Sequence, residues 1–150
     1  MTEVVVAGAL VVAAFNALPG LLGAWRWYCC EPSRAFWLLL RVGQGSAITL
    51  ALAVGALAVD GSYSSERLFY LYALLPLVVA FVAEQLRVIS AQTILDRHEL
   101  ADARAVGELG EDEQRTVVAE IMRRELGVMA LSTLVVVFLA LRAAGTAHGF

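Results

Sequence analysis

The chain has 150 residues, of which 60% are apolar and 17% charged, and it carries a net charge of -3 with a mean hydropathy of +0.75. This composition is too apolar for an ordinary soluble domain and predicts an integral membrane protein. The charged residues collect in one region without forming a basic patch, which excludes nucleic acid as a partner. No internal repeat or low-complexity linker divides the chain, so we predict a single membrane domain over residues 1–150.

Four apolar segments approach the length of about 20 residues with which an α-helix crosses a bilayer. They cover residues 4–24, 36–59, 68–88 and 126–144. The first follows Met-Thr-Glu without a basic flank, and no convincing cleavage site follows it, so we expect it to remain as a helix. The predicted fold class is therefore all-α, an integral membrane four-helix bundle, with the lipid bilayer as a partner.

The arginines predict how these helices are oriented. Arg26 and Arg34 follow the first span, and 60–67 holds one arginine, while the amino terminus holds none. The segment after the third span holds Arg97, Arg104, Arg115, Arg123 and Arg124. Because short cytoplasmic loops collect Arg, we expect a multi-pass protein of the cell (plasma) membrane with both termini outside. All 11 basic residues are Arg, a bias that a GC-rich bacterial genome explains as easily as a physical demand does, so we give it no functional weight.

Aromatic residues flank two of the spans, as expected at a lipid headgroup layer. The inner set is Trp25, Trp27 and Tyr28, and the outer set is Tyr63, Phe69, Tyr70 and Tyr72. We predict that both sets fix the depth of the helices and carry no chemistry.

The segment 89–125 has the pattern of a cytoplasmic helical hairpin that extends the third and fourth helices. Residues recur at three- and four-residue steps along one narrow face: Ala91, Ile94, Leu95, His98, Ala101 and Ala105. This pattern predicts that the third helix continues to about Ala105. Gly107 and Gly110 then favour a break, and the acidic residues 111–113 suit the first turn of a new helix. An apolar stripe leads from there into the fourth span through Val117, Val118, Ile121 and Val128.

Polar residues of three spans are predicted to share one layer near the inner surface. The stretch FWLLLRVGQG, residues 36–45, carries two of them in an otherwise apolar helix. The layer comprises Asn16, Arg41, Gln44, Glu84, Gln85 and Arg87. An Arg at the centre of a membrane helix costs about 3 kcal/mol on insertion scales, so Arg41 needs a partner, water or access to the headgroups.

Four interpretations of this layer stay open at this point. Arg41, Glu84 and Arg87 can form a buried ion-pair triad, with Gln44 and Asn16 bonding backbone groups freed near Pro19. Arg41 can instead extend to lipid phosphates. The excess of Arg over Glu also suits an anionic ligand, such as the headgroup of an anionic lipid, a carboxylate or a phosphate. Finally, Glu84 can carry a proton in a transport cycle.

Two further patterns concern helix shape and packing. Pro19-Gly20 and Pro76 remove backbone hydrogen bonds, which is more typical of a plain kink than of a transporter binding site. The second span carries small residues that allow close helix approach, namely Gly43, Gly45, Ser46, Ala47, Ala51 and Gly55. We favour a contact within the bundle for these residues over a contact between copies.

The sequence offers little for metal or cofactor chemistry. Cys29 and Cys30 are the metal candidates, but no CxxC spacing or neighbouring His supports them, and two reduced thiols are the preferred interpretation. His98 and His148 lie outside the spans, which disfavours a haem. No hydrolase, phosphate-loop or metalloprotease motif is present, so we predict no cofactor and favour a non-enzymatic protein.

Two functions are compatible with these patterns. The first is a non-enzymatic membrane assembly or interaction protein, or a small subunit of a larger membrane complex, with further copies or other membrane subunits as partners. The second is a small oligomeric ion or proton channel or transporter that uses Arg41, Gln44 and Glu84.

Overall fold

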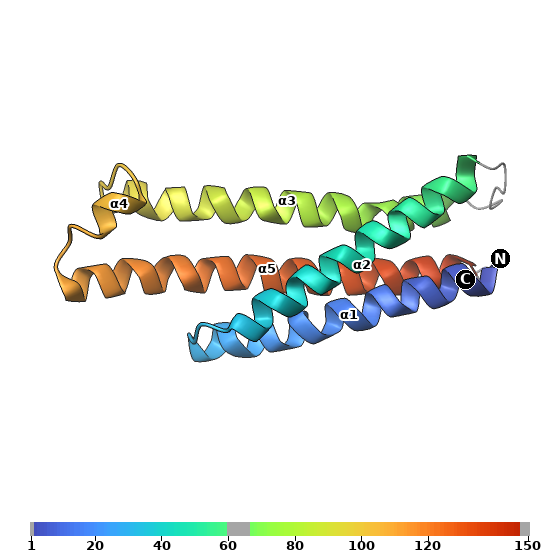
Figure 1. The fold of residues 1–150 in the computed structure, drawn as a ribbon, viewed down its shortest axis with the longest axis horizontal. Helices are drawn as coiled ribbons and strands as arrows, with labels where there is room; N and C mark the ends of the chain where they lie inside the picture. The colour runs from blue at the N-terminus through green and yellow to red at the C-terminus, as the bar shows by residue number, and fades with distance from the viewer. Residues whose placement is uncertain (1, 60–66, 148–150) are drawn as a thin grey trace.

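The computed structural model describes residues 2–59 and 67–147, and its long elements are all α-helices (Figure 1). The helices are α1 Thr2–Cys29, α2 Arg34–Val59, α3 Arg67–Arg97, α4 Ala103–Val106 and α5 Glu111–Ala147. The predicted all-α fold with four long apolar helices is confirmed, and each of the four is long and apolar enough to cross a membrane. Tyr63, His148 and the side chain of Phe69 lie outside the described residues.

The long helix α5 lies at the centre of the arrangement. It contacts α1 along one side and α3 along another, while α2 crosses from α1 towards α3 (Figure 1). The ends of α3 and α5 that are joined by α4 project beyond the turn between α1 and α2 (Figure 1). The first turn of α1 and the last turn of α5 lie at the opposite end. The predicted hairpin is therefore a distinct extension of the bundle.

Small residues allow α1 to approach α5 and α2 closely. A Cβ atom added to Gly23 would lie 2.4 Å from the ring of Phe36 in α2 and 2.9 Å from the Cβ of Ala130 in α5. Further along the same helices, the largest core cluster consists mainly of alanines and valines of α1, α2 and α5, with Leu50 of α2 and Ala73 of α3. Close packing of this kind gives many dispersion contacts between the helices, each small and together large.

The small residues of α2 divide between two faces. Gly43, Ala47 and Ala51 are buried in the bundle, as we favoured for the whole set. Gly45 and Gly55 face open space, because a Cβ atom added at either would meet nothing within 4 Å. For Gly45 the reason is the helical period of about 3.6 residues, which turns it away from Gly43 and Ala47, each two residues distant.

The predicted course of the third helix is wrong beyond Arg97, where α3 ends. Glu99 has a φ of 57°, a left-handed conformation that a continuing helix excludes. Asp102 then caps α4, because its side chain accepts hydrogen bonds from the backbone N–H groups of Arg104 and Ala105. Ala101 is consequently exposed and not part of a continuous apolar face.

The hairpin nevertheless has a packed core. Ile94, Leu95, Val106 and Val117 form a buried cluster at its centre. The acidic residues Glu111, Asp112 and Glu113 occupy the first turn of α5 as predicted. The prediction for Val118 is wrong, since its side chain is 41% exposed.

Candidate functional site

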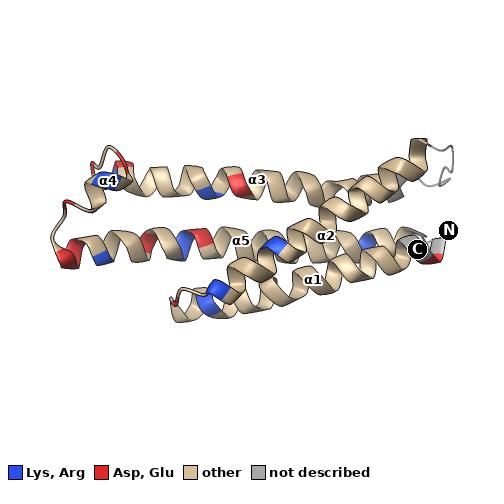
Figure 2. Cartoon of the chain, viewed as in Figure 1, with Lys and Arg blue, Asp and Glu red and all other residues tan. Residues whose placement is uncertain are grey.

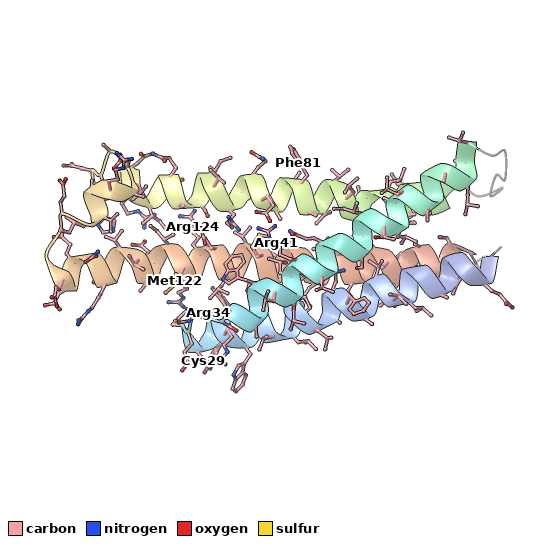
Figure 3. The ribbon with its side chains drawn as sticks, viewed as in Figure 1. Cys29, Arg34, Arg41, Phe81, Met122 and Arg124 are labelled. Carbon is pink, nitrogen blue, oxygen red and sulfur yellow. The ribbon has the colours of Figure 1, made fainter. Side chains whose placement is uncertain are left out.

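A closed polar triangle joins α2 to α3. Arg41 donates through Nη1 to Oε1 of Gln44 and to Oε1 of Glu84, both at 2.8 Å. Gln44 donates through Nε2 to the same Glu84 oxygen at 3.0 Å. Arg41 lies on the α3 side of α2, near the point where α2 crosses α5 (Figure 3). Each of the three side chains therefore has a partner within the triangle.

The triangle continues to α5 through Arg87. Nη1 of Arg87 lies 3.4 Å from Oε2 of Glu84, and its Nε lies 4.0 Å from Oε1 of Glu125. The guanidinium carbon lies 5.3 Å from the centroid of the Trp37 ring, within the range of a cation–π contact. Glu84 and Arg87 face the same side of α3 because they are three residues apart. We call Arg41, Gln44, Glu84, Arg87 and Glu125 the polar cluster.

Glu125 is the member that the sequence-based interpretation missed. The sequence-based prediction assigns it to the hairpin, one residue before the fourth span, and so gives it no partner among the residues of the predicted spans. A signal was present, since Glu125 falls between Ile121 and Val128 in the apolar stripe of α5. A charged residue at an inward position of such a stripe needs a counter-charge.

Glu125 changes the charge of the site. With two arginines and two glutamates, the polar cluster has no net charge when all four groups are ionised. The sequence-based count had two arginines against one glutamate and gave an excess positive charge. The charge of the polar cluster therefore gives no support to a purely anionic ligand at this site.

Asn16 and Gln85 lie outside the polar cluster. Asn16 is only 2% exposed, and its Nδ2 donates to the carbonyl oxygens of Val12 at 2.9 Å and Gly43 at 3.2 Å. It thus ties α1 to α2, and its acceptors differ from those expected near Pro19. Gln85 is exposed, because one residue along a helix rotates the side chain by about 100° away from Glu84.

Two cavities adjoin these residues. The smaller measures about 10 Å³, which is room for about one water molecule. It is lined by Asn16, Leu40, Gln44, Ala47, Ala80, Ser132, Thr133 and Val136. The larger measures about 320 Å³ and lies where the turn between α1 and α2 meets α2, α3 and α5. It is lined by Pro32, Trp37, Arg87, Met122, Glu125 and Leu126.

The metal candidates do not form a coordination site. Cys29 and Cys30 are both exposed and free, and Cys30 has a φ of 55° where α1 ends. Within residues 2–59 and 67–147, no group of three His, Cys, Asp or Glu side chains is arranged to hold a metal ion. His98 instead lies in the hairpin, with Nε2 3.2 Å from Oε2 of Glu120.

Comparison with known protein families, with curated proteins and with solved structures finds nothing that matches this chain.

Proposed function

We propose that this chain is an integral membrane protein with a non-enzymatic assembly function, which binds another subunit through its hairpin. The observation that carries the proposal is the projection of α3, α4 and α5 beyond the rest of the bundle (Figure 1). A catalytic or transport function does not require this extension. A docking function benefits from the extension, because the extension holds a contact surface beyond the ends of α1 and α2 (Figure 1).

The end of the hairpin, residues 96–113, carries a net negative charge on a packed support, and we call it the acidic tip. Residues 96–113 include seven acidic and two basic residues, a net charge of -5, and all seven acidic side chains are exposed. Figure 2 shows the charged residues gathered towards this end of the molecule. We infer a partner with a basic contact surface, since complementary charge speeds association and like charges oppose it. A subunit of a different protein therefore suits this surface better than a second copy of the chain, whose residues 96–113 would carry the same negative charge.

The surface of the bundle supports insertion into a membrane. Large apolar side chains are exposed along α3 and α5, among them Val78, Phe81, Leu131, Phe138 and Leu141. A soluble monomer rarely exposes a continuous apolar surface of this extent. Trp25 and Tyr28, at the end of α1 nearest the hairpin, are also exposed and suit a headgroup layer. The distribution of Arg supports a cytoplasmic hairpin with both termini outside.

The geometry of the polar cluster is consistent with a structural role, in which it holds helices together. Its closest bonds run between its own members, and its charges balance. Polar bonds of this kind between helices fix their register inside a membrane. The assembly function therefore needs no ligand at Arg41.

Reversal of the tip charge tests the proposal. Glu99→Lys with Glu108→Lys changes the charge of residues 96–113 from -5 to -1, and both positions lie outside the helices. We expect a co-purifying subunit to be lost on native gels of gently extracted protein. Glu99→Asp with Glu108→Asp keeps the charge and should retain the subunit. An unchanged band pattern in the reversed variant would contradict the proposal.

Labelling tests the orientation independently. In a Cys29→Ser, Cys30→Ser background, Ser62→Cys should react with a membrane-impermeant maleimide on intact cells. In the native background, Cys29 and Cys30 should react only after the cells are opened. The opposite pattern would place the hairpin outside.

The transport alternative has one observation in its favour, the small cavity beside Gln44, whose lining includes the polar side chains of Asn16 and Thr133. A single water there would connect polar groups of α1, α2 and α5 and could pass a proton. Under this alternative, Glu84→Gln abolishes proton flux in reconstituted vesicles, with Gln85→Ala as the control at an exposed neighbour. Equal flux in both variants and in the native protein would remove the alternative.

A further inference from the structure

The larger cavity contains two opposite charges that the protein itself pairs only loosely. Arg87 reaches Glu84 at 3.4 Å and Glu125 at 4.0 Å. Charge-assisted hydrogen bonds are usually about 2.7–2.9 Å long. Arg41 and Glu84, by contrast, meet at 2.8 Å. Within residues 2–59 and 67–147, the carboxylate of Glu125 and most of the five N–H donors of Arg87 are thus left for a third group.

The position of the cavity selects the kind of ligand. Its wall includes Pro32 of the turn between α1 and α2, so it opens where the hairpin leaves the bundle. The exposed Trp25 and Tyr28 lie at the same end of α1, and such aromatic residues mark the headgroup layer of a membrane. Met122, Leu126 and the ring of Trp37 give the cavity an apolar side. Its volume of about 320 Å³ lies at the lower end of the range for small-molecule sites.

We propose that this cavity binds the headgroup of a phosphatidylethanolamine lipid. Arg87 binds the phosphate, and Glu125 accepts hydrogen bonds from the ammonium group. Met122, Trp37 and Leu126 contact the glycerol and the first carbons of the chains. We call the cavity the headgroup pocket. The inference rests on the membrane insertion that forms part of the proposed function.

The charge pattern distinguishes this headgroup from other common ones. An anionic headgroup without an amine would satisfy Arg87 but face the carboxylate of Glu125 without a counter-charge. A choline headgroup carries a positive charge but has no N–H group to donate to Glu125. Of the ethanolamine, glycerol and choline headgroups, ethanolamine is the one whose N–H-bearing ammonium next to a phosphate satisfies both side chains. Glu125 is therefore the specificity-determining residue, and Arg87 binds phosphate in any phospholipid.

Native mass spectrometry of lipid-loaded protein tests the proposal. The purified protein is reconstituted into vesicles of equal parts phosphatidylethanolamine, phosphatidylglycerol and phosphatidylcholine and is then extracted gently. We expect the ethanolamine lipid to be retained about tenfold over each of the others, the factor that one charge-assisted hydrogen bond gives. Equal retention of all three lipids would overturn the proposal.

Variants assign the effect to the headgroup pocket. Glu125→Gln keeps the size of the side chain and should remove the preference for ethanolamine over the other two headgroups. Arg87→Gln should lower the retention of all three. Arg124→Gln removes an exposed charge next to Glu125 and should behave as the native protein. An unchanged preference in Glu125→Gln overturns the assignment.

A second readout keeps the test valid if a variant folds poorly. In Trp25→Phe, Trp27→Phe protein, Trp37 is the remaining tryptophan and lines the pocket. Phosphatidylethanolamine with bromine near the glycerol should quench its fluorescence more than the matching phosphatidylglycerol does. Equal quenching by the two lipids would contradict the headgroup pocket but not the membrane insertion. Release of the native protein from membranes by alkaline carbonate would contradict both.

Discussion

The helix α5 holds its two main neighbours by different means. Towards α1 it offers small residues, so that Gly23 lies against Ala130 and Phe36 with no room for a Cβ atom. Towards α3 it offers charged residues, since Glu120 meets Arg97 at 2.7 Å and Glu125 lies near Arg87. The contact with α1 suits a permanent interface in an apolar medium. The contact with α3 is more polar, and it carries both the hairpin and the headgroup pocket.

The apolar core of the hairpin is where the α3–α5 contact is most easily broken. Ile94 is fully buried, with 0% exposure. We expect Ile94→Ala to cost about 2–5 kcal/mol, the range for removing a large buried aliphatic side chain. Amide hydrogen exchange should show lost protection over 91–121 and native protection in α1. Val118→Ala, at an exposed position of the same hairpin, should change little, and equal effects of the two would refute a packed hairpin core.

Gly23 tests the α1–α5 contact. A methyl group at this position would overlap the Phe36 ring, which is fully buried, and would press against the Cβ atom of Ala130. We expect Gly23→Ala to destabilise the bundle by about 1–3 kcal/mol through overpacking. Unfolding in SDS, followed by tryptophan fluorescence, measures the change. Gly45→Ala adds the same methyl group in open space and should be neutral or stabilising, so a loss of equal size there would show that packing is not the cause.

The main helices and the existence of the hairpin were predictable from the sequence. Long apolar runs identify helices that can span a membrane, and the acidic residues after Gly110 mark the start of α5. The end of α3 was not predictable by periodicity, because the apolar pattern continues past it. What ends the helix is local, namely the left-handed Glu99 and the cap formed by Asp102.

The candidate site was predictable in part. The residues Arg41, Gln44, Glu84 and Arg87 do come together, since their level in the bundle follows from their position in each helix. Glu125 was missed because depth was counted from predicted span boundaries, which excluded it by one residue. Gln85 was included by level alone, although the helical period turns it away from Glu84. A site prediction therefore needs two properties of each residue: its depth along the helix and the direction in which the helical period turns its side chain.

Removal of the Arg41–Glu84 pair measures how much a polar bond contributes to holding α3 in the bundle, compared with the close packing that holds α1. Interhelical polar bonds in membranes contribute about 0.6 kcal/mol on average and at most about 1.7. We expect Glu84→Gln to cost about 1 kcal/mol in SDS unfolding, which is less than Gly23→Ala. A double-mutant cycle with Arg41→Gln isolates the pair. A coupling energy of zero would mean that the bond contributes nothing to register.

The smallest effect is expected at Arg97, a single turn from Ile94. Its side chain is 58% exposed and that of Glu120 37% exposed, so water and salt screen the pair. We expect Arg97→Gln to cost about 0.2–1 kcal/mol, an effect that 1 M salt should remove because charges are then screened within about 3 Å. Hydrogen exchange over 91–121 measures it, with Arg115→Gln as the control for an exposed pair within one helix. If Arg97→Gln opened the hairpin as far as Ile94→Ala does, charge and not apolar packing would hold α3 to α5 there. In that case salt would separate α3 from α5 in the hairpin as readily as it would release the partner subunit from residues 96–113.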